Sequence, residues 1–183
     1  GEVLVTFHES EDASVEIARW SGESMILPRI PLRYDEWGIR KGWATPLLIR
    51  MAADVQLEPG KYQFLIRARA ESRLWIDGTL TLTTDPITYV PPNGEEPVTP
   101  VVEPPAPGVR PAGYHQQEEL GVVEIESVEP IRVVLEMIVG GPQARTETGE
   151  VGVAVRREGE EEVFHVLAPA GREQLLELTD AAI

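Results

Sequence analysis

The side chains best suited to contact a ligand in this sequence are its large aromatics, which lie mostly in the first half of the chain. Trp and Tyr rings stack on sugar rings and anchor protein interfaces, because they bury a large area at a small cost in conformational entropy. In the stretch RLWIDG the indole of Trp75 would share one strand face with two polar side chains. The candidate ligand-binding residues are therefore Trp75, Asp77, Arg73, Trp37, Trp43 and Tyr34.

A purely structural role remains open for the same residues. Trp37 and Trp43 would close one end of the fold, and Trp20 would pack inward. Asp77 and Gly78 stand between two alternating apolar segments, which is a strong signal for a two-residue hairpin loop, because both loop positions need a positive φ. The pattern alone does not choose between a binding face and hairpin chemistry.

Catalytic groups do not form a recognisable set. The histidines His8, His115 and His165 are far apart and lack metal-ligand spacing. The sequence has no H-E-x-x-H, no G-x-S-x-G, no phosphate-binding loop and no dinucleotide glycine pattern. We therefore expect a protein that is not an enzyme and needs no cofactor. A hydrolase would require a pocket with two carboxylates at glycosidase spacing, about 5–10 Å apart.

One acidic cluster has the oxygen ligands that calcium prefers. Glu9, Glu11 and Asp12 lie in the segment HESEDAS. The spacing does not match an EF-hand loop, which needs a central Gly and a terminal bidentate Glu. We expect a solvated turn there and predict no metal site.

The net charge and the apolar content of the chain exclude several classes of binding partner. The 183 residues carry 31 acidic and 16 basic side chains and a formal net charge of -15, so phosphate backbones and anionic membranes would be repelled. We expect no nucleic-acid binding. No apolar run approaches the ~20 residues that cross a bilayer, so no membrane insertion is expected. Cysteine is absent, which excludes disulfides and thiolate chemistry. Because the chain begins at Gly1 rather than Met, we expect one domain of a longer protein.

Alternating apolar residues predict strands along most of the chain, and no strand–helix rhythm is present. In the segment from Tyr62 to Ala70 every second residue is apolar, and Leu74 and Ile76 would pair with Leu80 and Leu82 across the Asp77–Gly78 loop. This pattern predicts an all-β fold, an antiparallel sandwich or jelly roll. The other predicted strands cover residues 2–8, 14–20, 47–57, 121–128, 131–139, 150–158 and 161–168.

Two segments depart from the strand pattern. Residues 85–119 are dense in proline and lack a hydrophobic period, which predicts a long proline-rich insertion in an extended conformation. It would serve as a docking arm or as a strap over its own sandwich. Residues 29–46 combine Gly, Pro and three aromatics and predict an ordered loop. We expect one domain over residues 1–170 and a tail or linker over 171–183.

The run LEPGKYQFLIRARAESRLWIDGTL resembles the PA-fourteen module, named after the N-terminal domain of anthrax protective antigen. The family pattern, Pro-Gly-x-Tyr-x-Phe followed by Arg-Leu-Trp-Ile-Asp-Gly, is matched from Pro59 to Phe64 and from Arg73 to Gly78. SVEIARWSG and PIRVVLEMIVGG resemble an earlier and a later segment of the module. GWATPLLIRM and the proline-rich insertion are similar to modules of large planctomycete envelope proteins.

This resemblance implies a jelly-roll sandwich in a periplasmic, cell-envelope or secreted protein. It implies a non-catalytic carbohydrate-recognition or adhesion module of an exported multidomain bacterial protein, with a glycan as its partner. The alternative is a structural spacer or protein-interaction domain that positions neighbouring domains of the parent protein. Sugar-binding adhesins of the family hold calcium through two adjacent aspartates. This chain has no Asp-Asp pair, so the adhesin type of calcium site is not expected.

Overall fold

The computed structural model describes most of the strands that the sequence predicts. The described residues are 1–9, 13–27, 47–68, 71–85, 104, 106–107, 109, 117–139, 151–160 and 162–171, together with the backbone of 34–35 and 38–39. Among them no helix has the length and apolar character needed to span a membrane. The predicted loop 29–46 and the tail from 172 lie outside the described residues, apart from those two short backbone pieces.

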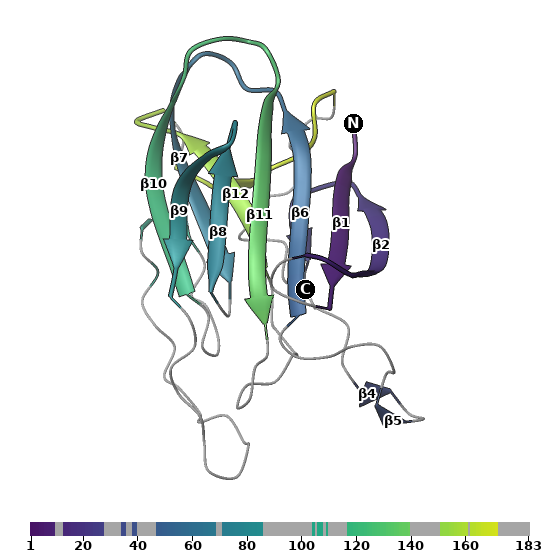
Figure 1. Ribbon diagram of the computed structural model, residues 1–183. Coiled ribbons are helices and arrows are strands. Elements are labelled where there is room, and N and C mark those ends of the chain that lie inside the picture. Colours follow the sequence, from purple (N-terminus) through teal and green to yellow (C-terminus); the bar gives the residue numbers. More distant parts are fainter. Residues whose placement is uncertain are drawn as a thin grey trace.

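Two antiparallel sheets pack face to face (Figure 1). The six-stranded sheet faces the viewer in Figure 1 and has the order β2-β1-β6-β11-β8-β9. Its strands are β1 (Val3–His8), β2 (Glu16–Gly22), β6 (Leu47–Val55), β8 (Ser72–Ile76), β9 (Thr79–Thr84) and β11 (Ile131–Val139).

The second sheet lies behind the first and has the order β10-β7-β12-β13, with a short strand β3 also paired to β12. Its strands are β3 (Ile26–Leu27), β7 (Gly60–Ala68), β10 (Gln117–Ile125), β12 (Val151–Arg157) and β13 (His165–Val166). A separate two-stranded pair joins β4 (Tyr34–Asp35) to β5 (Gly38–Ile39). These layers confirm the predicted all-β, antiparallel sandwich.

The core fills the space between the two sheets, and alternation decides which residues enter it. In β1 the side chains of Val3, Val5 and Phe7 are buried. Trp20 packs inward against Phe7, with ring centroids 4.5 Å apart, as one of the two sequence interpretations expected. In β7 the inward-facing residues are Tyr62, Phe64, Ile66 and Ala68, the face predicted from the sequence.

Some predicted boundaries and pairings are wrong. β10 begins at Gln117, inside the range predicted for the insertion, and ends at Ile125 instead of Val128. The strand predicted over 161–168 shortens to His165–Val166. Leu82 pairs with Leu74 as expected, but Leu80 pairs with Trp75 rather than with Ile76. The two-residue loop pairs Ile76 with Thr79, which places Leu80 opposite Trp75 on the outer face. A β-bulge between Leu74 and Trp75 then brings Leu82 opposite Leu74.

Three described residues of the segment that was predicted as a proline-rich insertion lie against the sandwich. Val109 is buried in a small apolar cluster on the outer face of the second sheet, and Ala106 packs beside it. Arg156 of β12 donates a hydrogen bond of 2.8 Å to the carbonyl oxygen of Pro107. These contacts favour a strap over a free docking arm for this piece. The cluster contains Leu65, Val109, Ala154, Phe164 and Val166.

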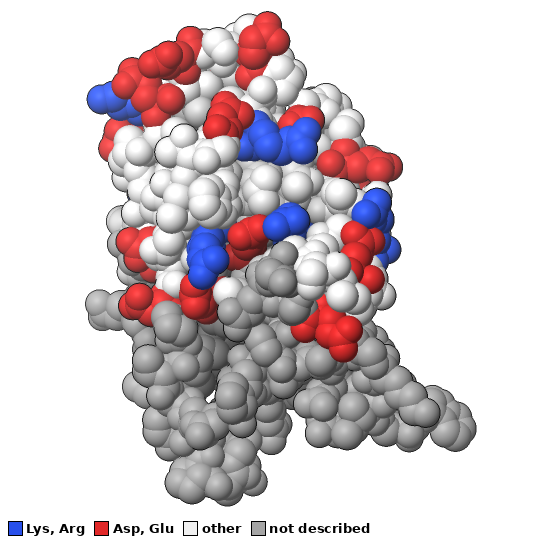
Figure 2. All heavy atoms as spheres, in the orientation of Figure 1, with Lys and Arg blue, Asp and Glu red and all other residues white. Residues whose placement is uncertain are grey.

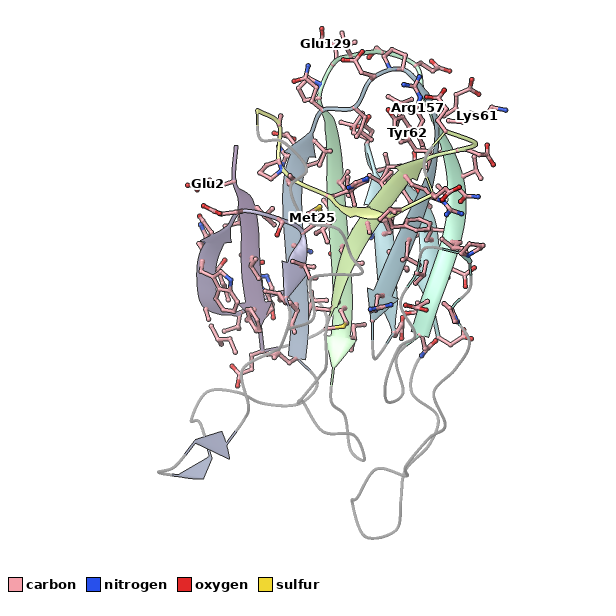
Figure 3. The ribbon with its side chains drawn as sticks, turned by 180° about the vertical axis from the view of Figure 1, so that it is seen from behind. Glu2, Met25, Lys61, Tyr62, Glu129 and Arg157 are labelled. Carbon is pink, nitrogen blue, oxygen red and sulfur yellow. The ribbon has the colours of Figure 1, made fainter. Side chains whose placement is uncertain are left out.

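The Pro-Gly-x-Tyr segment closes one end of the sandwich, where Figure 3 shows Tyr62 and Arg157 together. Arg157 lies over the Tyr62 ring at 5.9 Å and donates a hydrogen bond of 2.9 Å to the carbonyl oxygen of Pro59. Gly60 has φ 154°, and a Cβ there would lie 2.9 Å from a guanidinium nitrogen of Arg157. This half of the family pattern therefore holds the fold together.

Candidate functional site

The outer face of the six-stranded sheet brings together three of the six predicted site residues. Arg73 and Trp75 lie on β8 with their side chains on this face, and Asp77 follows in the hairpin loop. Tyr34 lies in β4, where only the backbone is described. Trp37 and Trp43 lie outside the described residues.

A row of apolar side chains crosses this face from strand to strand. Leu4 of β1 is the cross-strand partner of Ala52 of β6, and Ala52 is the partner of Val134 of β11. Val134 in turn pairs with Trp75, and Trp75 pairs with Leu80 of β9. The two end residues are the most open, since Leu4 is 39% and Leu80 46% exposed. We call these five residues the apolar row.

Charged and polar side chains border one side of the apolar row, two residues further along each strand. Thr6 of β1 is the partner of Arg50, Arg50 is the partner of Glu136, and Glu136 is the partner of Arg73. The Nη2 of Arg50 lies 2.6 Å from Oε1 of Glu136, and Arg73 is ion-paired to Glu71. The pairing neutralises this border without removing its hydrogen-bonding groups.

The other border is shorter and includes the hairpin loop. Arg132 of β11 is ion-paired to Asp54 of β6, with Nη2 2.9 Å from Oδ2. The backbone N–H of Arg132 donates to Oδ1 of Asp77 at 2.7 Å, and the N–H of Asp77 donates to the carbonyl oxygen of Arg132 at 2.9 Å. Figure 2 shows uncharged surface between two rows of charged atoms on this face.

Two ion pairs on this face, Arg19–Glu16 of β2 and Arg132–Asp54, shift the pKa values of their members. The Arg19 guanidinium donates hydrogen bonds of 2.8 and 2.7 Å to Glu16 and lowers the pKa of that carboxyl, while Glu16 raises the pKa of Arg19. The hydrogen bond to Asp54 likewise raises the pKa of Arg132. These shifts favour the charged forms of Glu16, Arg19 and Arg132, so the three groups act as hydrogen-bonding partners rather than as proton donors at neutral pH.

Asp77 has a structural role in the hairpin, which a substitution can measure. Its φ is 46° and that of Gly78 is 77°. Asp77→Ala should lower the free energy of unfolding by about 2 kcal/mol, because alanine disfavours positive φ and cannot accept the hydrogen bond from Arg132. Urea unfolding checks this.

The matched control for that change is Asp77→Asn, which keeps an acceptor oxygen and tolerates the same φ. It should cost well under half as much. Equal losses for the two variants would show that the carboxylate charge, and not the loop geometry, is what stabilises the hairpin.

Sequence reasoning missed four members of the apolar row. Leu4, Ala52 and Val134 stand in segments where apolar residues occupy both faces of the strand, so alternation did not single them out. Leu80 was expected to pair with the inward-facing Leu74 or Ile76, although a two-residue loop at Asp77 and Gly78 places it opposite Trp75. The sequence does show that several strands carry apolar residues on both faces, but it does not show which of these strands are neighbours.

The side chains of this face can contact a ligand by stacking and by hydrogen bonding. Among the described side chains, no group of three or more His, Asp or Glu residues could hold a metal ion. The carboxylates of Glu16, Asp54, Glu71 and Glu136 are each ion-paired to an arginine. An exposed apolar row with paired charges beside it offers stacking and hydrogen bonding to a ligand.

Comparison with known proteins shows which solved structures have a similar fold. The sequence matches no protein-family profile, and no curated protein matches it. Among solved structures, the PA14 domain of the MpAFP antifreeze protein has a TM-score of 0.59 at 11% identity, with 91% of this chain and 86% of that one covered. The chain has a PA14-like fold.

Two further solved structures are similar to the chain. A PA14 sugar-binding domain from an RTX adhesin has a TM-score of 0.56 at 10% identity, covering 93% of this chain and 98% of that one. An anti-sigma factor domain-containing protein has a TM-score of 0.57 at 10% identity over 91% of this chain. This chain spans 45% of the length of that protein. At these sequence identities the structural similarity establishes the fold only, and the function has to be argued from the residues of the site.

Proposed function

We propose that the PA14-like chain is a non-catalytic carbohydrate-recognition or adhesion module. The observation that carries the proposal is the position of Trp75, which lies half-buried on the outer face between Val134 and Leu80. An indole held there can stack on the apolar face of a sugar ring. Arg73, two residues earlier on the same face of β8, can donate hydrogen bonds to the hydroxyl groups of the sugar. The similarity to the PA14 sugar-binding domain of an RTX adhesin supports the same class of ligand.

We also propose that the module belongs to an exported multidomain bacterial protein and acts in the periplasm, in the cell envelope or outside the cell. The adhesin domain among the structural neighbours supports an extracytoplasmic place. A glycan array probed with the intact chain tests the ligand class. Binding to at least one class of glycan is expected, and no binding to any glycan would overturn the proposal.

Trp75→Ala should weaken glycan binding about tenfold or more, because the stacking surface is lost. Isothermal titration with the best ligand from the array measures the loss. Trp75→Phe is the matched control, since it keeps an aromatic face and should retain most of the affinity. If Trp75→Ala bound as tightly as the unmodified chain, the glycan would occupy another part of the molecule.

A second candidate function is a spacer or protein-interaction domain that positions neighbouring domains of the parent protein. The open ends of the apolar row favour this function, because covering the exposed Leu4 and Leu80 side chains would lower the free energy of a complex with a protein partner. This alternative predicts binding of the isolated chain to other fragments of the parent protein, measured by sedimentation velocity, and no response on the glycan array.

A further inference from the structure

The apolar row has the dimensions of an extended ligand. Its five members lie on five neighbouring strands, β1, β6, β11, β8 and β9, each paired to the next in register. Adjacent strands are about 4.8 Å apart, so the row is about 20 Å long. That spacing is close to the length of one pyranose residue in a linear β-linked chain. One sugar could therefore lie over each strand.

The row lies open on the face of the sheet, with only a shallow dip in its middle. Small side chains, Ala52 and Val134, occupy its middle, and the larger Leu4, Trp75 and Leu80 lie toward its ends. Monosaccharides and other small ligands usually need a concave pocket that encloses most of their surface. An open, elongated surface instead gains affinity by contacting several units of a polymer at once. This shape favours a chain of sugars over a single one.

The borders of the row are nearly charge-neutral, although the whole chain carries a net charge of -15. Four arginines, Arg19, Arg50, Arg73 and Arg132, are ion-paired to four carboxylates on this face. Asp77 adds one further carboxylate, which accepts a hydrogen bond from the backbone N–H of Arg132. An acidic polymer would meet arginines that already have partners and would be repelled by the rest of the molecule. Uncharged hydroxyl groups can use the remaining guanidinium N–H groups and carboxylate lone pairs without breaking the pairs.

We propose that the apolar row binds a linear, uncharged polysaccharide that lies across the strands of the six-stranded sheet. This inference rests on the proposed carbohydrate function and adds the site, the orientation and the charge class of the ligand. Leu4 and Leu80 contact the two ends of the bound segment, and Trp75 stacks on a sugar near the Leu80 end. The paired side chains on both borders bind its hydroxyl groups.

The test uses the intact chain and neutral β-linked oligosaccharides, namely the cello-, xylo- and manno- series from disaccharide to hexasaccharide, in isothermal titrations. Affinity should rise with length until the row is filled. Leu80→Ser and Leu4→Ser should each weaken binding of the hexasaccharide about fivefold to tenfold, because an apolar contact is lost, and should change disaccharide binding far less. Added salt should have little effect on an uncharged ligand.

The matched control is Val122→Ser. Val122 is 53% exposed on β10 of the second sheet, so the change removes a similar exposed apolar group away from the row and should leave affinity unchanged. The urea midpoint of each variant shows that the fold is intact.

The failures of this inference and of the proposed function are distinguishable. If a glycan binds with an affinity that changes neither with its length nor in the two leucine variants, the row is not the binding site, and the proposed carbohydrate function stands. A preference for polygalacturonate or alginate, lost at high salt, would overturn the uncharged ligand class. Self-association abolished by Leu80→Ser would assign the row to a second copy of this chain. Absence of binding to every glycan would overturn both proposals.

Discussion

Replacing Glu118 by alanine should lower the free energy of unfolding by about 3 kcal/mol, one of the largest effects expected in this chain. Glu118 of β10 is the cross-strand partner of Arg67 of β7, and its Oε1 accepts a hydrogen bond of 2.5 Å from the Arg67 Nε. The two side chains are only 7% and 2% exposed. Removing the carboxylate leaves a guanidinium charge in a site of low dielectric constant, which is costly. Urea unfolding of the intact chain measures the loss.

The neighbouring Glu119 is the matched control, because it is exposed and carries the same charge. Glu119→Ala should change stability by only a few tenths of a kcal/mol. The double variant Arg67→Met with Glu118→Leu should recover most of the stability that Glu118→Ala loses, since two apolar side chains avoid the desolvation of charge. Equal effects of Glu118→Ala and Glu119→Ala would mean that the ion pair is not buried in solution.

The fold was predictable from alternation because most strands bury one face. The period of two in the segment from Tyr62 to Ala68 already assigned its inner face correctly. The β8–β9 hairpin shows where this reasoning stops. Asp77 and Gly78 form the two-residue loop as expected, yet Thr81 is an extra residue that shifts the pairing by one. A bulge of this kind changes no local propensity, so only the packed structure reveals it.

The candidate site was predictable only within one strand. Arg73 and Trp75 are two residues apart and were placed on one face by alternation. Their partners Leu4, Ala52 and Val134 come from β1, β6 and β11, which are distant in the sequence. The strand order that brings them together depends on how the chain connects the two sheets. A single sequence carries no local signal for that order, and so the apolar row appeared only in three dimensions.

Phe164→Ala is the second change with a large expected effect, a loss of about 3–4 kcal/mol of unfolding free energy. The ring is fully buried on the outer face of the second sheet, where it packs with Leu65, Val109 and Val166. The guanidinium of Arg156 lies over it at 4.4 Å from the ring centroid. Truncation would leave a cavity and remove this cation–π contact. Val163→Ala, at the adjacent half-buried position, should cost much less.

This change also tests whether Phe164 holds the strap. Val109 packs in the same cluster, so thermolysin should cleave the proline-rich insertion faster in Phe164→Ala than in the unmodified chain. Glu118→Ala supplies the comparison, because it lowers global stability by a similar amount without removing a residue of that cluster. If both variants are cleaved at the same rate, cleavage follows global unfolding and the cluster does not secure the insertion. Faster cleavage in Phe164→Ala alone means that this one ring stabilises the packing of a segment more than 50 residues away in sequence.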